Sequence, residues 1–355
     1  MADYKEAGVD IVAGDNASKI AYKYARSTFV ARAGMMGEPV SDEGSFAGLL
    51  DMGDFYLVQG DDGVGTKIEI AEKINKYDTL GYDLLAMVCD DAICLGAETI
   101  SITNTLDTNK VDPIVIEQLM KGLAKACLEQ KIVIPGGEIA EVGKSVNGNV
   151  WNATAVGIVA KDRVISGENI SVGDKIIALY EPGFRSNGFT LVRYILETKF
   201  GKDVYNQVSP FGSSWGEAML TPSTIYSSAI LNLIGRFGSK RRFNIKGIAH
   251  ITGGGIPGNF NRILKRSGLG ANFDNLFAPS KIVKEIQRIG EVAEEEAYKT
   301  WNMGNGMMLV VDPDDAESVL SDLKIKAKIV GEIIDRKQII INSCGNDPQQ
   351  MIFDI

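Results

Sequence analysis

Histidine and cysteine are scarce in this chain, and their scarcity narrows the chemistry open to it. The 355 residues contain one histidine, His250, and four scattered cysteines with no Cys-x-x-Cys pair. A disulfide framework or a zinc site is therefore not expected, and a histidine-rich metal site is excluded. The sequence around His250 contains no nucleophile elbow for a Ser-His-Asp arrangement. Catalysis would have to rest on carboxylates, lysine, amides and backbone groups.

Long hydrophobic runs and an excess of basic residues are also missing. No apolar run approaches the length of a membrane span, and Met1–Glu6 lacks the hydrophobic core of a signal peptide. The formal net charge of −9 argues against broad binding to nucleic acid or an anionic membrane, although a local basic pocket could hold phosphate. We therefore expect a cytoplasmic protein with a small-molecule partner, no nucleic acid and no membrane.

The length and composition favour a globular protein of two domains. A chain of 355 residues exceeds a typical single domain, and its apolar (45%) and charged (23%) fractions are those of soluble proteins. The pattern of short strands and amphipathic helices indicates a mixed α/β (α+β) fold class. Residues 34–54, rich in Gly, Met, Ser and Asp, are predicted to be mobile. Because polarity rises near 160–172, the expected units are residues 1–165, residues 166–345 and a tail over 346–355.

The stretch from Phe55 to Lys67 is the first candidate binding motif. It is expected to form a short strand, a turn rich in glycine and a helix that begins near Thr66. Backbone N–H groups in such a turn, with the positive end of a helix, can bind phosphate. The adjacent carboxylates of Asp61 and Asp62 would repel phosphate unless a cation such as Mg²⁺ lay between them. An ordinary acidic turn is the alternative.

Asp91 interrupts the apolar stripe of a helix expected from about Tyr82 to Leu95. It shares one face of that helix with Leu84 and Val88. A buried carboxylate is costly unless it is paired or bound to a metal. A structural ion pair is the alternative, but we favour a functional Asp91 and expect its neighbour Asp90 to be solvated.

Three further turns carry candidate binding groups. Pro135–Glu141 combines two glycines with Glu138 after a short strand, which repeats the glycine-acid pattern of the first motif. Gly253–Gly255 precede a helix expected after Pro257 and could bind an anion through the backbone, although a tight connection is the alternative. Ser186 or Asn187, beside Arg185, is expected to cap a helix.

In their order along the chain, these motifs resemble phosphoribosylformylglycinamidine cyclo-ligase, also called aminoimidazole ribonucleotide synthetase. The Asp-Gly-Val-Gly-Thr-Lys run is shared with related ATP-dependent enzymes. The N-terminal run Tyr4–Asp10 and the Ala-His-x-Thr-Gly-Gly-Gly run point more specifically to the cyclo-ligase. The matching segments are Tyr4–Asp10, Gly60–Lys67, Gly81–Met87, Leu95–Glu98, Pro135–Glu138, Ala140–Glu141, Ser186–Gly188, Leu191–Arg193, Ile248–His250, Thr252–Gly255, Asn302–Gly304 and Gly306–Met307.

This resemblance implies an activity, a fold and an assembly. The activity is ATP-driven ring closure of formylglycinamidine ribonucleotide to 5-aminoimidazole ribonucleotide in purine biosynthesis, a ligase reaction with Mg²⁺. The fold is two α/β domains, of which the N-terminal one binds ATP and metal and the C-terminal one binds the substrate phosphate. The N-terminal domain forms the interface of a homodimer, and the active sites lie in the cleft between the domains.

The resemblance also implies roles for individual residues. Asp62, Asp91 and His250 are the catalytic candidates, and Asp62, Asp91 and Glu138 are the metal candidates. The ATP-binding candidates are Asp61, Gly63, Val64, Gly65, Thr66 and Lys67. The substrate-binding candidates are Arg185, Ser186, Asn187, Gly188, Thr252, Gly253, Gly254 and Gly255.

The chain departs from the family pattern at several positions. The family usually has Asn-Asp at Asp90-Asp91, histidine at Arg185, glutamate at Gly258 and arginine at Lys299. Arginine is always charged, so proton transfer at position 185 is in doubt. A paralog that phosphorylates another acceptor and a non-catalytic nucleotide-binding protein therefore stand as alternatives to the cyclo-ligase.

Overall fold

The structure is a computed structural model that describes residues 7–8, 11–40 and 45–355. Most of the Tyr4–Asp10 motif and part of the segment 34–54 lie outside these residues. In the described part, no helix is long and apolar enough to cross a membrane.

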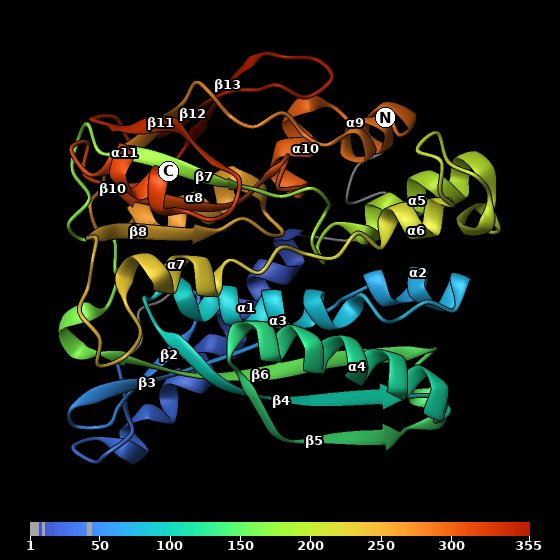
Figure 1. Ribbon diagram of the computed structural model, residues 1–355, viewed down its shortest axis with the longest axis horizontal. Helices are drawn as coiled ribbons and strands as arrows, with labels where there is room; N and C mark the ends of the chain where they lie inside the picture. The colour runs from blue at the N-terminus through green and yellow to red at the C-terminus, as the bar shows by residue number, and fades with distance from the viewer. Residues whose placement is uncertain (1–6, 9–10, 41–44) are drawn as a thin grey trace.

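The chain forms two layers, each built on one β-sheet (Figure 1). The N-terminal sheet has the order β1-β2-β3-β6-β4-β5, with only β4 and β5 parallel. Its layer contains α1 (Ile11–Ser27), η1 (Phe29–Arg32), β1 (Glu38–Pro39), β2 (Gly48–Asp51), β3 (Phe55–Gly63), α2 (Lys67–Ile74), α3 (Leu80–Cys94), β4 (Glu98–Thr108), α4 (Pro113–Gln130), β5 (Val133–Glu141), η2 (Gly143–Ser145), β6 (Asn149–Ala160) and η3 (Lys161–Arg163).

The C-terminal sheet has the order β13-β12-β9-β11-β7-β10-β8 and is mostly antiparallel. Its layer contains β7 (Lys175–Tyr180), α5 (Phe189–Phe200), η4 (Val204–Asn206), α6 (Trp215–Met219), α7 (Ser227–Ile234), β8 (Ile245–His250), α8 (Gly255–Leu264), β9 (Gly270–Phe273), α9 (Lys281–Ile289), α10 (Glu294–Thr300), β10 (Asn305–Val311), α11 (Ala316–Asp322), β11 (Ala327–Ile334), β12 (Gln338–Asn342) and β13 (Gln350–Asp354).

Helix α3 lies between the two sheets and joins them. It packs on β3 and β6 on one side and on β8 and α7 on the other (Figure 1). Its apolar residues, such as Leu84 and Val88, are buried in a cluster that continues into the C-terminal layer. The helix therefore fixes how one layer sits on the other.

Two buried carboxylates of α3 anchor the segment 221–227 of the C-terminal layer. Asp83 Oδ1 accepts a hydrogen bond from the backbone N–H of Ser223 at 3.0 Å. Asp90 Oδ1 accepts from the backbone N–H groups of Tyr226 and Ser227, both at 3.0 Å. Because Asp83 and Asp90 are seven residues apart, they lie on one face of the helix and hold the segment at two points.

The mixed α/β fold with two layers confirms the expected fold class, but several local predictions were wrong. Strand β3 continues through Gly60 to Gly63, and β5 runs to Glu141, so both predicted glycine-acid turns are largely strand. Glycine permits a turn without requiring one, and pairing with β6 and β4 keeps these segments extended. The predicted tail contains β13, which pairs with β12, and the segment 34–54 contains β1 and β2.

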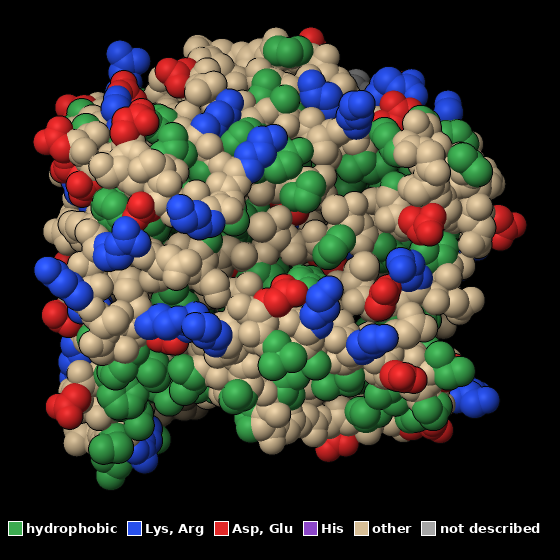
Figure 2. All heavy atoms as spheres, in the orientation of Figure 1, with side chains coloured by type: hydrophobic (Ala, Val, Ile, Leu, Met, Phe, Trp, Pro, Cys, Tyr) green, Lys and Arg blue, Asp and Glu red, His purple; other side chains and the backbone are tan. Residues whose placement is uncertain are grey.

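Acidic and basic side chains are interspersed on the face shown in Figure 2, with no broad area of one sign. Such a mixed surface lacks the basic stripe that characterises a nucleic-acid interface.

Candidate active site

Three glycine-containing segments from different elements meet between the two layers. They follow β3, precede α5 and precede α8. The backbone of Gly65 approaches Ser186, since a Cβ built on Gly65 would lie 3.5 Å from the Ser186 carbonyl oxygen. A Cβ on Gly253 would lie 3.6 Å from Asn187 Nδ2, and Thr66 Oγ1 lies 3.3 Å from Thr190 Oγ1. The structure therefore brings together the three predicted phosphate-binding segments.

Glycine is required where these segments pack against their neighbours. A Cβ on Gly63 would lie 2.1 Å from Asn152 Oδ1, and one on Gly255 would lie 1.8 Å from the Tyr298 carbonyl oxygen. Gly255 also has a φ of +59° and is the first residue of α8. The helix therefore begins before Pro257, and not after it as predicted.

The start of α5 is not capped by a side chain. Its N-cap is Gly188, with a φ of +77°, so the predicted capping role of Ser186 or Asn187 was wrong. Ser186 Oγ, Asn187 Oδ1 and Trp301 Nε1 are instead buried, with no hydrogen-bond partner among the described residues. Buried polar groups without partners are rare in folded proteins and often mark the position of a ligand or ordered water. Trp301, which packs against Gly188, had no sequence signal.

Asp62 and Asp91 form a pair of carboxylates near these segments. Asp62 ends β3, where its Oδ1 accepts a hydrogen bond from its neighbour, the Gly63 N–H, at 2.7 Å. Burial and the nearby charge of Asp91 raise the pKa of Asp62 to about 6. Burial raises the pKa of Asp91 to about 7, although the positive charges of Arg262 and Arg185 oppose the rise. The charge of Asp91 disfavours ionisation of Asp62, and a cation between the two carboxylates would relieve this.

His250 holds Asp91 in place. Its Nδ1 lies 2.8 Å from Asp91 Oδ1, and its ring is fully buried at the end of β8. Burial, with the charge of Arg185, lowers the pKa of His250 well below its usual value, so the imidazole is neutral at pH 7. An ionised Asp91 then selects the tautomer in which Nδ1–H donates. His250 Nε2 has no partner among the described residues.

The structure contradicts the expected environment of Asp90 but not that of Asp91. Asp90, predicted to be solvated, is fully buried and forms an ion pair with Arg185 at 2.8 Å. The Asp91 side chain is largely buried, as predicted, and keeps 22% of its surface exposed. The helical stripe that contains Asp91 borders the space between the layers, whereas Asp90 faces segment 221–227.

Arg185 does not lie where a substrate could contact its side chain. It is fully buried between Asp90 and Glu181, at 2.8 and 2.9 Å, and its guanidinium lies 5.0 Å from the centre of the Tyr226 ring. The predicted substrate contact of this side chain was therefore wrong. The guanidinium pairs with the two buried carboxylates, which an arginine can do through several N–H groups at once, and is not left facing a substrate. Its backbone, with a φ of +61°, turns the chain into Ser186.

Lys67 and Asp61 also point away from the glycine segments. The buried Lys67 ammonium lies 2.7 Å from both Asp83 Oδ1 and the Thr221 carbonyl oxygen. Asp61 accepts a hydrogen bond from Thr154 Oγ1 on the outer face of the sheet, whereas Asp62 lies on the inner face. Adjacent residues of a strand alternate in direction, so the prediction of one acidic loop with both carboxylates at the phosphate was wrong.

Glu138 is too far away to join Asp62 and Asp91. It pairs with Thr105 on β4, which pairs with Asn152 on β6, which pairs with Gly63. Three strand spacings separate Glu138 from Gly63, which amounts to about 14 Å. No three His, Cys, Asp or Glu side chains in the described ranges converge to hold a metal ion. The predicted three-carboxylate metal site was therefore wrong within one chain.

Asp62 and Asp91 nevertheless fit Mg²⁺, which is commonly bound by one or two carboxylates together with substrate phosphates. The pKa values of both carboxyl groups are raised, so the ionised form of each is disfavoured when no cation is bound.

The two other family departures lie outside these segments. Gly258 is exposed on α8, and no atom lies within 4 Å of where its Cβ would be, so a glutamate would fit there. The Lys299 ammonium pairs with Glu295 on α10 and lies 5.5 Å from the centre of the Phe353 ring. Neither departure changes the glycine segments or the two carboxylates.

The raised pKa of Asp91 predicts a pH-dependent stability. The folded protein keeps the Asp91 proton up to about pH 7, whereas the unfolded chain releases it near pH 4, so the free energy of unfolding falls as pH rises across this interval. We expect Asp91→Asn to lose part of that fall, on the order of 1.4 kcal/mol per unit of pKa shift. Urea denaturation at pH 5 and pH 8 measures it. Asp203→Asn, at an exposed position, is the control and should keep the parental fall.

Most of the chain matches one family, and curated relatives align over nearly all of it. Residues 44–159 match the N-terminal domain and residues 171–342 the C-terminal domain of AIR synthase related protein. The chain is 37% identical over 349 residues to phosphoribosylformylglycinamidine cyclo-ligase of Methanocaldococcus jannaschii, covering 96% of this chain and 94% of that one. It is 38% identical to the enzyme of the same name from Pyrococcus furiosus over 347 residues, covering 97% and 99%.

Solved structures share the fold at low identity. The chain aligns with a HypE-HypF complex at a TM-score of 0.60 and 20% identity, over 89% of this chain and 96% of that one. It aligns with AaThiL complexed with AMPPCP and TMP at 0.58 and 14% identity, over 87% and 91%. The sequence matches, with this shared fold, show that the chain belongs to the AIR synthase related family, among relatives named phosphoribosylformylglycinamidine cyclo-ligase.

Proposed function

We propose that the chain catalyses ATP-dependent closure of formylglycinamidine ribonucleotide to 5-aminoimidazole ribonucleotide, with release of ADP and phosphate, in de novo purine biosynthesis. The main support is that the chain is 37–38% identical, over nearly its whole length, to relatives named phosphoribosylformylglycinamidine cyclo-ligase. The site supports it, because the three glycine segments provide backbone groups for phosphate and two carboxylates stand beside them.

The reaction needs positioning and charge neutralisation more than an enzyme nucleophile. The formyl oxygen attacks the γ-phosphorus of ATP and ADP leaves; the amidine nitrogen then attacks the formyl carbon, and the oxygen departs with phosphate. Backbone groups of Gly63–Thr66 would hold the ATP phosphates, and Ser186–Gly188 with Thr252–Gly255 would hold the ribonucleotide. The buried Ser186 Oγ and Asn187 Oδ1 would gain partners from it.

Asp62 and Asp91 would hold Mg²⁺, which neutralises phosphate charge during the transfer. His250 would orient Asp91, and its neutral Nε2 would take up the proton that the attacking nitrogen releases.

A coupled assay with ATP, Mg²⁺ and formylglycinamidine ribonucleotide tests this function. We expect equal amounts of ADP and aminoimidazole ribonucleotide. ATP hydrolysis without the ring-closed product would rule the proposal out. The buried position of Arg185 removes the observation that favoured a different acceptor.

We further propose a homodimer formed through the outer face of the N-terminal sheet. Strand β6 presents Val150, Val156 and Ile158 on the face opposite its buried residues, and Val150 is 40% exposed. An apolar face of this kind is typical of a protein contact. We expect Val156→Asp to convert a dimer into a monomer in sedimentation experiments. Val172→Asp, at an exposed apolar residue outside the sheet, should leave the assembly unchanged.

We also propose a domain boundary between the end of β6 and the start of β7, within residues 160–172, and a cytoplasmic location suited to a reaction of small soluble metabolites.

A further inference from the structure

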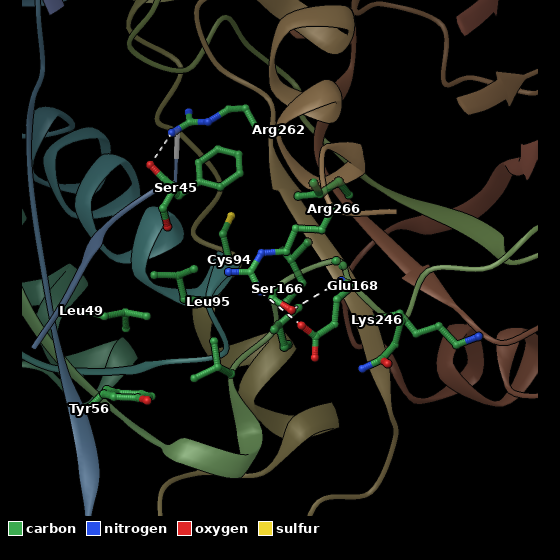
Figure 3. A pocket seen from close by; sticks show the side chains of 18 of the residues that line it. Ser45, Leu49, Tyr56, Cys94, Leu95, Ser166, Glu168, Lys246, Arg262 and Arg266 are labelled. Carbon is green, nitrogen blue, oxygen red and sulfur yellow. Dashed lines mark hydrogen bonds and ion pairs between the residues drawn. The ribbon is translucent and has the colours of Figure 1, made fainter. Parts of the chain in front are cut away.

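A second cavity lies between the two layers, beyond the C-terminal end of α3. Its volume is about 940 Å³, which is enough for a nucleotide-sized molecule. Figure 3 shows around it Cys94 at the end of α3, the next residue Leu95, Ser166 and Glu168 from the segment between β6 and β7, and Arg266 just after α8. We call this cavity the seam pocket.

The seam pocket is separate from the glycine segments. Helix α8 begins at those segments with Gly255 and reaches the seam pocket with Arg262, and Arg266 lines the pocket two residues after the helix ends. Gly255 and Arg266 are eleven residues apart, which corresponds to about 16 Å along a helical path. None of the substrate, ATP or metal candidates lines the pocket. A ligand here would occupy a site outside the proposed phosphate-binding segments.

The lining of the seam pocket is strongly basic in a chain of net charge −9. Among the residues that the structure describes, its acidic members are Asp162 and Glu168, whereas its basic members, besides Arg262, are Arg26, Lys161, Arg241, Lys246, Lys265 and Arg266. Three of the cations have carboxylate partners: Lys161 pairs with Asp51, Lys246 with Asp174 and Arg266 with Glu168. Among the described residues, the lining cations Arg26, Arg241 and Lys265 have no carboxylate partner.

Arg241, which lines the pocket, forms a close pair of like charges with Arg163, which does not line it. Arg241 Nη2 donates to the Arg163 carbonyl oxygen at 2.8 Å. Arg241 Nε and Arg163 Nη1 are both buried, and neither has an acceptor in the part of the chain that the structure describes. Burial and the charge of Arg163 lower the pKa of Arg241. Buried guanidinium N–H groups without acceptors are costly, and an anion in the pocket would give Arg241 an acceptor.

We propose that the seam pocket binds a phosphate-bearing small molecule, with its phosphate at Arg241. Phe46 and Tyr56 line the pocket as well and would contact the apolar part of that ligand. Arg262 connects the pocket to the reaction centre. Its guanidinium lies 3.8 Å from the centre of the Phe46 ring and donates to the Ser45 carbonyl oxygen at 2.8 Å (Figure 3), and its charge favours the ionised form of Asp91.

Titration calorimetry and thermal unfolding with inorganic pyrophosphate and AMP test this site in the full chain. Arg241→Gln keeps most of the side-chain volume and removes the charge, so we expect the Kd at the seam pocket to rise tenfold or more. The matched control is Arg242→Gln, because Arg242 is exposed, pairs with Asp322 and does not line the pocket. It should keep the parental Kd within twofold.

Thermal unfolding separates lost binding from lost folding. Without ligand, Arg241→Gln should melt at or above the parental temperature, since it relieves repulsion with Arg163. Pyrophosphate should then raise the Tm of the parent and of Arg242→Gln more than that of Arg241→Gln. Equal Kd values in all three proteins, or equal losses in both variants, would overturn the proposal.

Steady-state kinetics identify the source of the ligand. A tenfold rise in KM for formylglycinamidine ribonucleotide in Arg241→Gln, with kcat within threefold, would assign the phosphate to that substrate. An unchanged KM together with lost AMP or pyrophosphate binding would assign it to another phosphorylated metabolite. Because the binding measurement needs no turnover, failure of the proposed ligase activity would leave this test intact.

Discussion

Asp91→Asn is expected to lower kcat by about 10²–10³-fold while the protein stays folded. A charged group aimed at the reacting phosphates has an effect of this size when it is removed. Asparagine keeps the shape of Asp91 and its contact with His250, but it cannot supply the negative charge that a bound cation needs. Because the ionised carboxylate is disfavoured in the folded state, its removal should leave the Tm unchanged or raise it.

The coupled assay for ADP and ring-closed product, run beside a thermal melt, measures this effect. Asp62→Asn should behave in the same way, since Asp62 faces Asp91 from β3. Asp61→Asn is the matched comparison, because the adjacent carboxylate points to the outer face of the sheet. If all three variants lost activity equally, the assignment of Asp62 to the inner face would be contradicted. Activity of Asp91→Asn within threefold of the parent would remove Asp91 from the catalytic group.

The glycine-rich segments were predictable from sequence, whereas the directions of their charged side chains were not. Gly65, Gly188 and Gly255 all have positive φ values, and their runs of glycine show in the sequence. The prediction failed at Asp61 because it depended on whether Gly60 lay in a turn or a strand. That choice is made by pairing with Ala155 on β6, ninety-five residues later. Local propensity contains no information about such a partner.

Helical periodicity failed in the same way at Asp90, which was expected to be solvated and is fully buried. The pattern located α3 well, and it placed Asp91 on the apolar stripe. The pattern could not show that Asp90 would pack against segment 221–227 while Asp91 borders the space between the layers. That outcome depends on where segment 221–227 lies in the folded chain. The basic lining of the seam pocket was hidden for the same reason. Arg26, Lys161, Arg241 and Arg266 are far apart in sequence and meet only in the folded chain.

Arg185→Ala is expected to destabilise the protein by ~3–5 kcal/mol, the usual cost of breaking a buried ion pair by removing one partner. The substitution would leave Asp90 and Glu181 buried without their shared cation. Urea denaturation measures the loss. Lys299→Ala removes a cation from an exposed pair with Glu295 and should cost less than ~1 kcal/mol. Similar costs for the two variants would contradict the structural role of Arg185.

The contact between Asp90 and Arg185 also explains two family departures as one change. The family usually has asparagine and histidine at these positions, and here both are charged and lie 2.8 Å apart. Arg185→His alone should therefore be strongly destabilising, because Asp90 loses its partner. Asp90→Asn added to it should recover ~1 kcal/mol or more, a coupling that a double-mutant cycle measures. Additive effects would mean that the two departures arose independently. Since Asp90 adjoins Asp91 and Arg185 adjoins Ser186, the cycle should also show coupling in kcat.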